Sequence, residues 1–360
     1  MKTTTSLSGK QISCAKKIFF FALILTFSIQ GNLLAQKRIV LQHNGLATAF
    51  SELDSCKAHL QSGDTIYFPG AGYTIGEWVI NKRVTIFGAG HYPDSTVATG
   101  TTYLIGSIRL LTGADNTFIQ GIYLTGNIAF GSDAASQTVN NFTLSRCSVA
   151  TIYLSYNGSG ITASNNIVIR ENNIRGHLYG GYATGVLVTN NILNATMAYF
   201  SNALFKNNII LGTYCNNSPI DYTNNNSFQN NVFILSYCNG NNFVMLNSNT
   251  NDFQNNAFSS GQLFPDGSNT GSGNWINIDP AAFFVNFNAY SFSYTENYHL
   301  KSPATYVGND AKQIGIYGSA FPYKEGAVPI NPHIQAKTIA PTTNTNGELN
   351  INIKVAAQNY

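Results

Sequence analysis

Three ionisable side chains in the middle of the chain are the first candidates for chemistry. Arg146, Glu171 and Lys206 each occupy the polar position that precedes a repeated Asn pair or a weaker copy of it. If the repeats stack, we expect the three to lie along one stripe, where an Arg or Lys could take the proton next to a uronic carboxylate. The alternative is a solvated row of salt bridges, which adds little stability. They remain candidates, and no residue is assigned as catalytic.

The other acidic residues do not form the pair of carboxylates that glycoside hydrolysis needs, about 5–9.5 Å apart. They occur singly, most of them beside Gly, Asn or Ser, where turn capping explains them: Asp115, Asp133, Asp221, Asp252 and Asp266. A lyase would also need several acidic groups around Ca²⁺. We therefore expect no cofactor, with Ca²⁺ only if the chain is a lyase, and no metal site, because the histidines show no ligand spacing.

Tyrosines form a second set. Several follow the Asn pairs at a short distance: Tyr179, Tyr182, Tyr199, Tyr214, Tyr222 and Tyr237. Sugar rings dock on aromatic faces, while neutral polar groups bond their hydroxyls. We select Tyr179, Tyr214 and Tyr237 as candidate ligand-binding residues. Ordinary aromatic stacking inside or outside a repeat structure is the alternative interpretation.

Two cysteines share this spacing. Cys215 and Cys238 each follow the second Asn of a pair by seven residues and come directly after a Tyr. Stacked repeats would bring their backbones to about 4.8 Å, which a disulfide permits. The alternative is two stacked, buried thiols.

A short repeated sequence motif must position all these residues. It consists of apolar residues, one polar residue, an Asn pair and a final apolar residue. It occurs at Arg170–Ile174, Val188–Ile192, Phe205–Ile209, Phe228–Val232 and Phe253–Ala257, so that consecutive copies lie 17 to 25 residues apart. Such a period indicates a solenoid, and each unit fits one coil of three brief strands. Asn tolerates left-handed backbone angles and can bond the next coil through its amide, so we expect Asn ladders.

The two ends of the repeat region have their own patterns. Residues 38–42 predict a strand, and Leu46–Leu60 places its apolar residues on one helical stripe, which predicts a helix that caps the first coil. The Pro-punctuated tail, residues 321–360, alternates from Gly347 to Ala356 and predicts one strand.

The first 35 residues predict an export signal. Lys10, Lys16 and Lys17 precede an apolar run at Ile18–Ile29. This run is too short to span a bilayer comfortably, so a cleaved signal peptide is favoured over an anchor. We expect a secreted, periplasmic or outer-surface protein with no membrane span after cleavage.

Parts of the chain resemble a known superfold. Ser62–Gly70 and Lys82–Gly90 resemble the opening of the secreted right-handed parallel β-helix proteins of the pectin-lyase-like superfold. Asn277–Gly318 resembles the closing signature of many secreted bacterial β-helix proteins, and the tail is similar to that of exported β-helix proteins of the Bacteroidota. The resemblance covers roughly residues 38–320. It implies fold and exported origin, but not an activity, because this superfold carries many functions.

Together these patterns predict an all-β chain, a single-stranded right-handed parallel β-helix of about ten coils with an N-terminal helical cap and a short C-terminal β tail. We expect the N-terminal strand and the cap helix at residues 36–61 and the parallel β-helix at residues 62–320. Charged residues make up only 10% of the chain and the formal net charge is +3. This gives no basic patch for nucleic acid. We expect a monomer.

The leading functional hypothesis is an exported protein that presents a neutral Asn- and Tyr-rich face to a polysaccharide or surface glycan without catalysis. One alternative is a polysaccharide lyase or glycoside hydrolase acting on an acidic glycan through Arg146, Glu171 and Lys206. The other is a purely structural surface protein. The sequence favours a non-enzyme.

Overall fold

The computed structural model describes residues 38–132, 135–155, 163–181, 183–194, 196–214, 218–238, 243–261 and 268–357. The predicted signal peptide at 1–35 lies outside these residues, as do Asp133, Tyr182, Cys215 and Asp266. From Arg38 onward the chain forms one compact unit. The two α-helices among the described residues, α2 (Leu53–His59) and α3 (Pro280–Phe283), are too short to traverse a bilayer.

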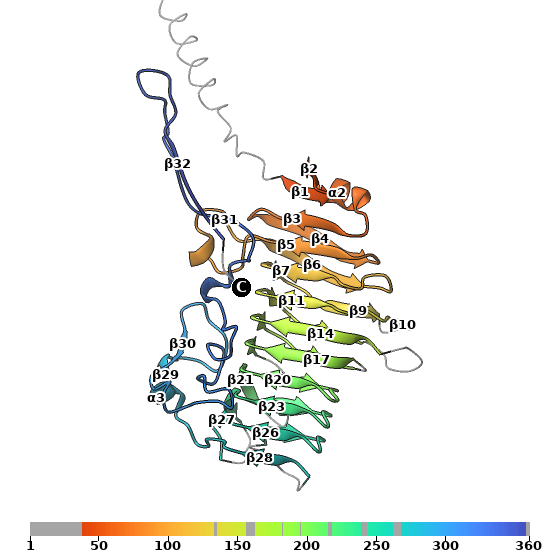
Figure 1. Cartoon of the computed structure of the whole chain (residues 1–360), viewed down its shortest axis with the longest axis vertical. Coiled ribbons are helices and arrows are strands. Elements are labelled where there is room, and N and C mark those ends of the chain that lie inside the picture. The colour runs from red at the N-terminus through yellow and green to blue at the C-terminus, as the bar shows by residue number, and fades with distance from the viewer. Residues whose placement is uncertain are drawn as a thin grey trace, which may run out of the picture. The chain divides into compact units, whose positions relative to one another are not determined.

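The described chain is a right-handed parallel β-solenoid, and ten solenoid strands stack on its first face (Figure 1). Face 1 is a sheet in which each strand pairs in parallel with the strand one turn later. Its solenoid strands are β3 (Asp64–Tyr67), β5 (Val84–Phe87), β7 (Phe118–Gln120), β11 (Thr143–Ser145), β14 (Asn165–Arg170), β17 (Thr184–Thr189), β20 (Leu204–Lys206), β23 (Ser227–Gln229), β26 (Asp252–Gln254) and β28 (Thr270–Ser272).

Faces 2 and 3 belong to one sheet that forks after the long strands β4 (Gly72–Ile80) and β6 (Tyr103–Leu110). Face 2 continues through β8 (Tyr123–Leu124), β12 (Ser148–Val149), β15 (Asn173–Ile174), β18 (Ile192–Leu193), β21 (Ile209–Tyr214), β24 (Val232–Tyr237) and β27 (Ala257–Phe258). Face 3 continues through β9 (Ile128–Ser132), β13 (Ile152–Tyr153), β16 (Leu178–Tyr179), β19 (Met197–Ala198), β22 (Ile220–Asp221) and β25 (Met245–Leu246), with β10 (Ala135–Ser136) beside β9.

Columns of identical or similar side chains fill the interior, because parallel pairing without shifts places equivalent residues above one another. Phe205, Phe228 and Phe253 are fully buried and stack with centroid distances of 4.7 and 4.5 Å. Each large side chain buried in this way contributes about 1.5–3 kcal/mol relative to exposure.

The predicted Asn ladder is confirmed. In each rung an Asn backbone N–H and its side-chain Nδ2 both donate to the Oδ1 of the Asn one turn later, for example Asn191 to Asn208 at 2.9 and 3.0 Å. The ladder runs through Asn172, Asn191, Asn208, Asn231, Asn256 and Asn274. Asn172, the first member of its pair, takes the place held elsewhere by the second, so the coil that contains Glu171 is shifted by one residue.

The residue just before each ladder Asn turns the chain from face 1 to face 2 with a left-handed backbone. This covered corner contains Arg146 (φ 51°), Glu171 (56°), Asn190 (54°), Asn207 (55°), Asn230 (58°) and Asn255 (52°). Asn is the non-Gly residue best suited to such angles, which explains why it prevails here.

The N-terminal cap differs in part from the prediction. The helix was expected over Leu46–Leu60, but the first five residues form strand β2 (Leu46–Phe50), which pairs antiparallel with β1 (Ile39–His43). Helix α2 begins only at Leu53 and buries Cys56. The turn between the strands is Asn44–Gly45, with φ of 48° and 82°, and a sequence of this kind favours a two-residue hairpin over a helix.

After the last coil the chain returns along face 2. This C-terminal segment, residues 279–330, contains α3, β29 (Phe284–Asn286), β30 (Asn297–Leu300) and a 3₁₀ turn, η2 (Glu325–Ala327); a similar turn, η1 (Asp94–Thr96), follows β5. The segment lies beside the coils (Figure 1). There it packs on the outward side chains Ile192, Ile209 and Val232 and forms a second apolar core with them.

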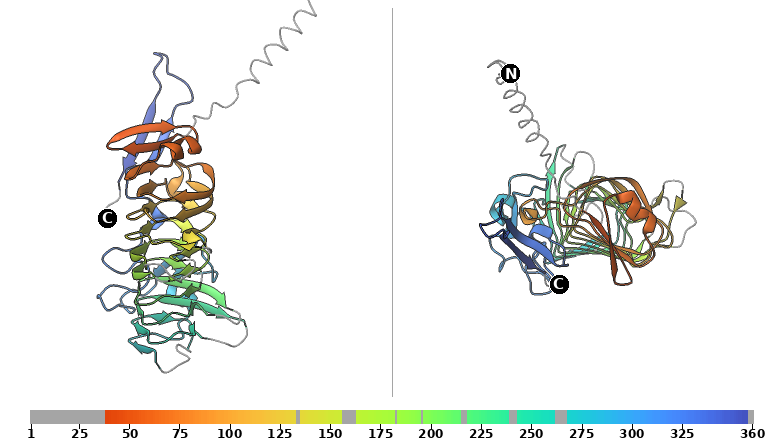
Figure 2. Two further views of the ribbon diagram at one scale, coloured as in Figure 1. Left: turned by 90° about the vertical axis from the view of Figure 1, so that its right-hand side faces the viewer. Right: turned by 90° about the horizontal axis from the view of Figure 1, so that it is seen from above.

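The tail also differs from the prediction, which gave it one strand. It contains two, β31 (His333–Ile339) and β32 (Ile351–Ala356), which pair antiparallel with each other as a hairpin (Figure 2). The side chains of this hairpin are mostly exposed.

Candidate functional site

The predicted stripe of Arg146, Glu171 and Lys206 is not one row. Arg146 and Glu171 share the covered corner, where Nε of Arg146 lies 2.8 Å from Oε2 of Glu171. Their side chains are only 3% and 4% exposed. Nη1 of Arg146 also donates to the carbonyl of Val328, in the C-terminal segment, at 2.8 Å. This buried ion pair is closed off by the chain itself and offers no open surface to a polymer.

Lys206 lies one position earlier, on face 1, in register with Thr189 and Gln229. Its Nζ lies 3.1 Å from Oδ2 of Asp310 in the C-terminal segment. The prediction failed because the Glu171 coil is shifted by one residue, so that Arg170 and not Glu171 shares the Lys206 column.

Two of the three predicted tyrosines are interior. Tyr214 and Tyr237 stand directly opposite each other on β21 and β24, as their shared spacing predicts. Tyr214 is 5% exposed and belongs to the main core, and Tyr237 packs against that core. Burial raises the pKa of both hydroxyls. Tyr214 is therefore a core residue without an open ligand-binding surface, whereas ligand binding by the partly buried Tyr237 stays a prediction.

Tyr179 lies on the outside, in a row of four tyrosines along face 3. Neighbouring ring centroids are 5.0 Å apart between Tyr153 and Tyr179, 6.1 Å between Tyr179 and Tyr199, and 5.4 Å between Tyr199 and Tyr222. Tyr199 and Tyr222 are each 50% exposed. Because the rings cover one another's faces, the row presents ring edges and phenolic hydroxyls to solvent. Partial burial raises the pKa of Tyr179.

Tyr199 and Tyr222 also begin the corner that leads from face 3 back to face 1. Both have left-handed backbones, with φ of 61° and 44°, and three residues later Asn202 and Asn225 do the same, at 55° and 59°. Three residues span at most about 10 Å. The tyrosine row therefore borders the residues of this turn, which we call the open corner because Tyr199, Asn202, Tyr222 and Asn225 are all exposed.

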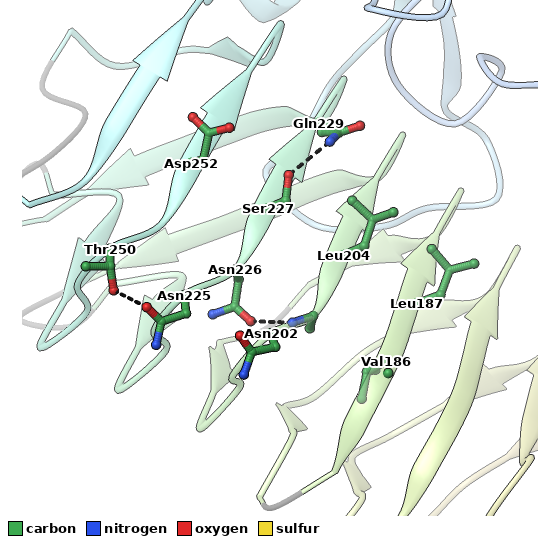
Figure 3. A pocket seen from close by; sticks show the side chains of 12 residues that line it. Val186, Leu187, Asn202, Leu204, Asn225, Asn226, Ser227, Gln229, Thr250 and Asp252 are labelled. Atoms are coloured by element: carbon green, nitrogen blue, oxygen red, sulfur yellow. Dashed lines mark hydrogen bonds between the residues drawn. The ribbon is translucent and has the colours of Figure 1, made fainter.

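A groove of about 740 Å³ lies on the other side of the open corner, on the outer surface of face 1 (Figure 3). Leu187 and Leu204, both half-buried, supply its apolar part. Neutral polar side chains and one carboxylate supply the rest: Asn202, Asn225, Asn226, Ser227, Gln229, Thr250 and Asp252. Its volume is in the range of small-molecule and oligomer sites.

Hydrogen bonds within the groove hold several of these groups in place. Oγ1 of Thr250 donates to Oδ1 of Asn225 at 2.6 Å, and Nε2 of Gln229 donates to Oγ of Ser227 at 3.0 Å (Figure 3). Asp252 accepts from Gln254 and Thr270 at 2.6 and 2.9 Å. Side chains fixed in this way lose little entropy when a ligand binds.

The groove lacks the groups for acid–base cleavage. Asp252 is the only carboxylate among its described lining residues, whereas hydrolysis by the common mechanism needs two. Among all described residues, no three His, Cys, Asp or Glu side chains gather closely enough to hold a metal ion. The geometry suits binding through hydroxyl groups and apolar contact.

The cysteines take no part in this surface. Cys56 and Cys147 are free and buried, and burial raises their thiol pKa values to about 11 and about 12. Cys238 is disulfide-bonded. Because Cys215 lies outside the described residues, its pairing with Cys238 stays a prediction.

The sequence contained signals for the residues that were missed. Asn202, Asn225 and Thr250 each stand three residues before a buried Phe of the core column, at 205, 228 and 253. Tyr153 follows Ile152 as Tyr179 follows Leu178, one coil apart. Aligning the coils on the interior column instead of the Asn pairs would have found both sets.

Comparison of the chain with protein-family models, with curated proteins and with solved structures gave no significant match in any of the three.

Proposed function

We propose that this chain is an exported, non-catalytic binding protein for a neutral polysaccharide, which lies along the open corner between the tyrosine row and the face 1 groove. The observation that carries the proposal is the groove itself, with its fixed neutral polar groups, two half-buried leucines and, among its described lining residues, a single carboxylate. Amide and hydroxyl groups suit sugar hydroxyls, and Leu187 and Leu204 suit the C–H face of a sugar ring.

The site extends along the solenoid axis, which supports a polymer as its ligand. Hydroxyl, amide and aromatic groups recur on successive coils, at Tyr199 and Tyr222 and at Asn202 and Asn225. Coils rise by about 4.8 Å, which is close to the length of one pyranose unit in an extended chain. A polysaccharide parallel to the solenoid axis could therefore repeat the same contacts from coil to coil.

The cellular setting of the proposal comes from the sequence. The predicted signal peptide at 1–35 and the resemblance to secreted pectin-lyase-like β-helix proteins of the Bacteroidota support a periplasmic, surface or secreted monomer. A glycan is the polymer such a protein would meet there.

Affinity electrophoresis against a panel of neutral and uronate polysaccharides tests the proposal. Tyr222→Asn removes the aromatic ring and introduces a residue that tolerates the left-handed backbone. Asn225→Gly removes the side-chain amide, and glycine also tolerates this backbone. We expect each to weaken binding roughly tenfold, since a hydrogen bond or aromatic contact is lost. Tyr103→Ala is the matched control, because Tyr103 also stacks on a tyrosine, Tyr123, but on face 2.

Three results would overturn the proposal. No retention on any polysaccharide would leave a structural role, and a loss of binding that Tyr103→Ala reproduces would show that the open corner is not the site. Release of unsaturated sugar from a uronate polymer would show a lyase instead.

A further inference from the structure

A second, half-open pocket lies between face 2 and the C-terminal segment, away from the open corner. This cavity of about 320 Å³ is bounded by Ile192 of face 2, by Tyr92, and by residues from β30, η2 and the chain around them. The cavity exists only because the C-terminal segment folds back over the coils.

Four tyrosine rings form much of its wall: Tyr92, Tyr298, Tyr317 and Tyr323. The rings of Tyr317 and Tyr323 are perpendicular, with an interplanar angle of 87° and centroids 6.2 Å apart. The hydroxyls of Tyr92 and Tyr323 lie 3.0 Å apart and bond each other. Burial raises the pKa of all four hydroxyls, so the rings stay neutral in water near pH 7.

The charged groups of the wall are mainly acidic. Glu296 and Glu325 line the cavity, and no Lys or Arg is among its described lining residues. Asn288 bonds both carboxylate oxygens of Glu296, through its backbone N–H at 3.0 Å and its amide at 3.2 Å. Nε2 of His299 lies 2.7 Å from Oε1 of Glu325, and its ring stacks on Tyr317 at 3.7 Å.

One buried hydroxyl in the wall has no complete partner. Tyr298 is 4% exposed, and its hydroxyl approaches the backbone of Ser293 without reaching hydrogen-bond geometry. Leaving such a group unpaired costs about 1–3 kcal/mol, and because the oxygen itself has almost no accessible surface, a ligand reaches it only if neighbouring side chains move.

We propose that this cavity binds a small organic cation of the ammonium class, held between the tyrosine rings and the carboxylates of Glu296 and Glu325. Aromatic faces attract cations through their quadrupole, and the attraction increases where water is excluded. The volume exceeds that of an inorganic ion and admits a substituted ammonium with a short chain.

The test compares two molecules of one shape. Choline and 3,3-dimethylbutan-1-ol differ in charge but hardly in size, and isothermal titration of the full chain with each separates cation recognition from apolar fit. We expect choline to bind with a Kd on the order of 1 mM and the neutral alcohol to bind at least roughly tenfold more weakly.

Substitutions locate the site. Glu325→Gln should weaken choline binding roughly tenfold, whereas Glu348→Gln, which removes an exposed carboxylate from the tail, should leave it unchanged. The Glu325 side chain is 73% exposed, so its replacement does not threaten folding. Glu296→Gln should have the same effect as Glu325→Gln, with circular dichroism to check that the fold is intact.

Equal affinity for choline and the neutral alcohol would overturn the proposal, as would choline binding that Glu325→Gln leaves intact. The proposal would also be overturned if choline did not bind at concentrations well above the millimolar range. Displacement of choline by neutral monosaccharides at similar concentrations would have the same meaning. None of these results bears on polysaccharide binding at the open corner, which the Tyr222 and Asn225 variants test separately.

Discussion

The two corners of the solenoid that flank face 1 use the same residue type in opposite ways. At the covered corner Asn190 is 2% exposed, and its Nδ2 donates to the carbonyls of Ile316 and Gly318 at 2.8 and 3.3 Å. At the open corner Asn225 has nearly the same backbone, with φ of 59° against 54°, but it is exposed. Backbone geometry therefore explains why Asn occurs at both corners, and the neighbouring face explains what its amide does.

The outward side chains decide which face is covered. On face 2 the outward column changes from Tyr123, Ser148 and Asn173 to Ile192, Ile209 and Val232. An apolar column of this length is costly in water, and the C-terminal segment buries it. On face 1 the corresponding column changes in the opposite sense, from Leu187 and Leu204 to polar residues, and it stays open as the groove.

The largest effect on this comparison is expected from the ion pair at the covered corner. Glu171→Ala leaves the Arg146 guanidinium buried without its carboxylate, which should lower the free energy of unfolding by about 3–5 kcal/mol. Urea denaturation measures the loss. Replacing both residues, with Arg146→Met and Glu171→Leu, should recover most of it. A loss below about 1 kcal/mol for Glu171→Ala would mean that the C-terminal segment does not exclude water there.

A matched pair of substitutions compares the two corners directly. Glycine keeps the left-handed backbone, so Asn190→Gly and Asn225→Gly differ mainly in the side-chain contacts that they remove. We expect Asn190→Gly to cost about 2 kcal/mol, because two carbonyls of the C-terminal segment lose their donor, and Asn225→Gly to cost less than about 0.5 kcal/mol. Equal losses in thermal or urea unfolding would contradict the distinction between the corners.

Alkaline pH should also lower the free energy of unfolding. Burial raises the pKa of Tyr294 from 10.0 to about 12 and that of Cys147 from 9.0 to about 12. The folded protein then holds these protons more tightly than the unfolded chain, so the stability they contribute is complete below pH 9 and is lost as pH rises toward 12. The urea midpoint should therefore fall between these values.

Tyr294→Phe checks the origin of that loss. It should reduce the fall of the urea midpoint above pH 10 and change it little at pH 7, apart from the lost hydroxyl contact with His91 at 3.2 Å. A midpoint that stays constant up to pH 11 would show that neither group is protected as described.

The coil architecture could be predicted because one chemical requirement repeats. Each ladder Asn must satisfy the same two backbone groups, so the phrase around Asn191, Asn208 and Asn231 recurs and reveals the period. Register inside a coil is harder to predict. Where Glu171 replaces Asn at the corner, the pair Asn172–Asn173 shifts by one, and only the partners one turn away show it.

The functional surface was predicted less well. Side chains along a strand point alternately into the core and toward solvent, and the residue type alone does not say in which direction a given tyrosine points. Tyr214 and Tyr237 were correctly placed opposite each other, yet Tyr214 belongs to the core and Tyr237 packs against it, whereas Tyr199 and Tyr222 lie at a corner and are exposed. The ends were ambiguous for a local reason. At Leu46–Phe50 the helical stripe and the Asn44–Gly45 turn gave conflicting signals, and the turn prevailed.

The way the C-terminal segment retraces the coils has a consequence for folding. Asn309 meets Asn230, Ile316 meets Asn190, and Ile330 meets Gln120, with sequence separations that grow from 79 to 126 to 210 residues. Most repeat proteins can mature coil by coil, since each unit touches only its neighbours. Here a later segment of the chain ties the middle and early coils together, so the solenoid keeps an apolar flank exposed until residues 309–330 have docked on it.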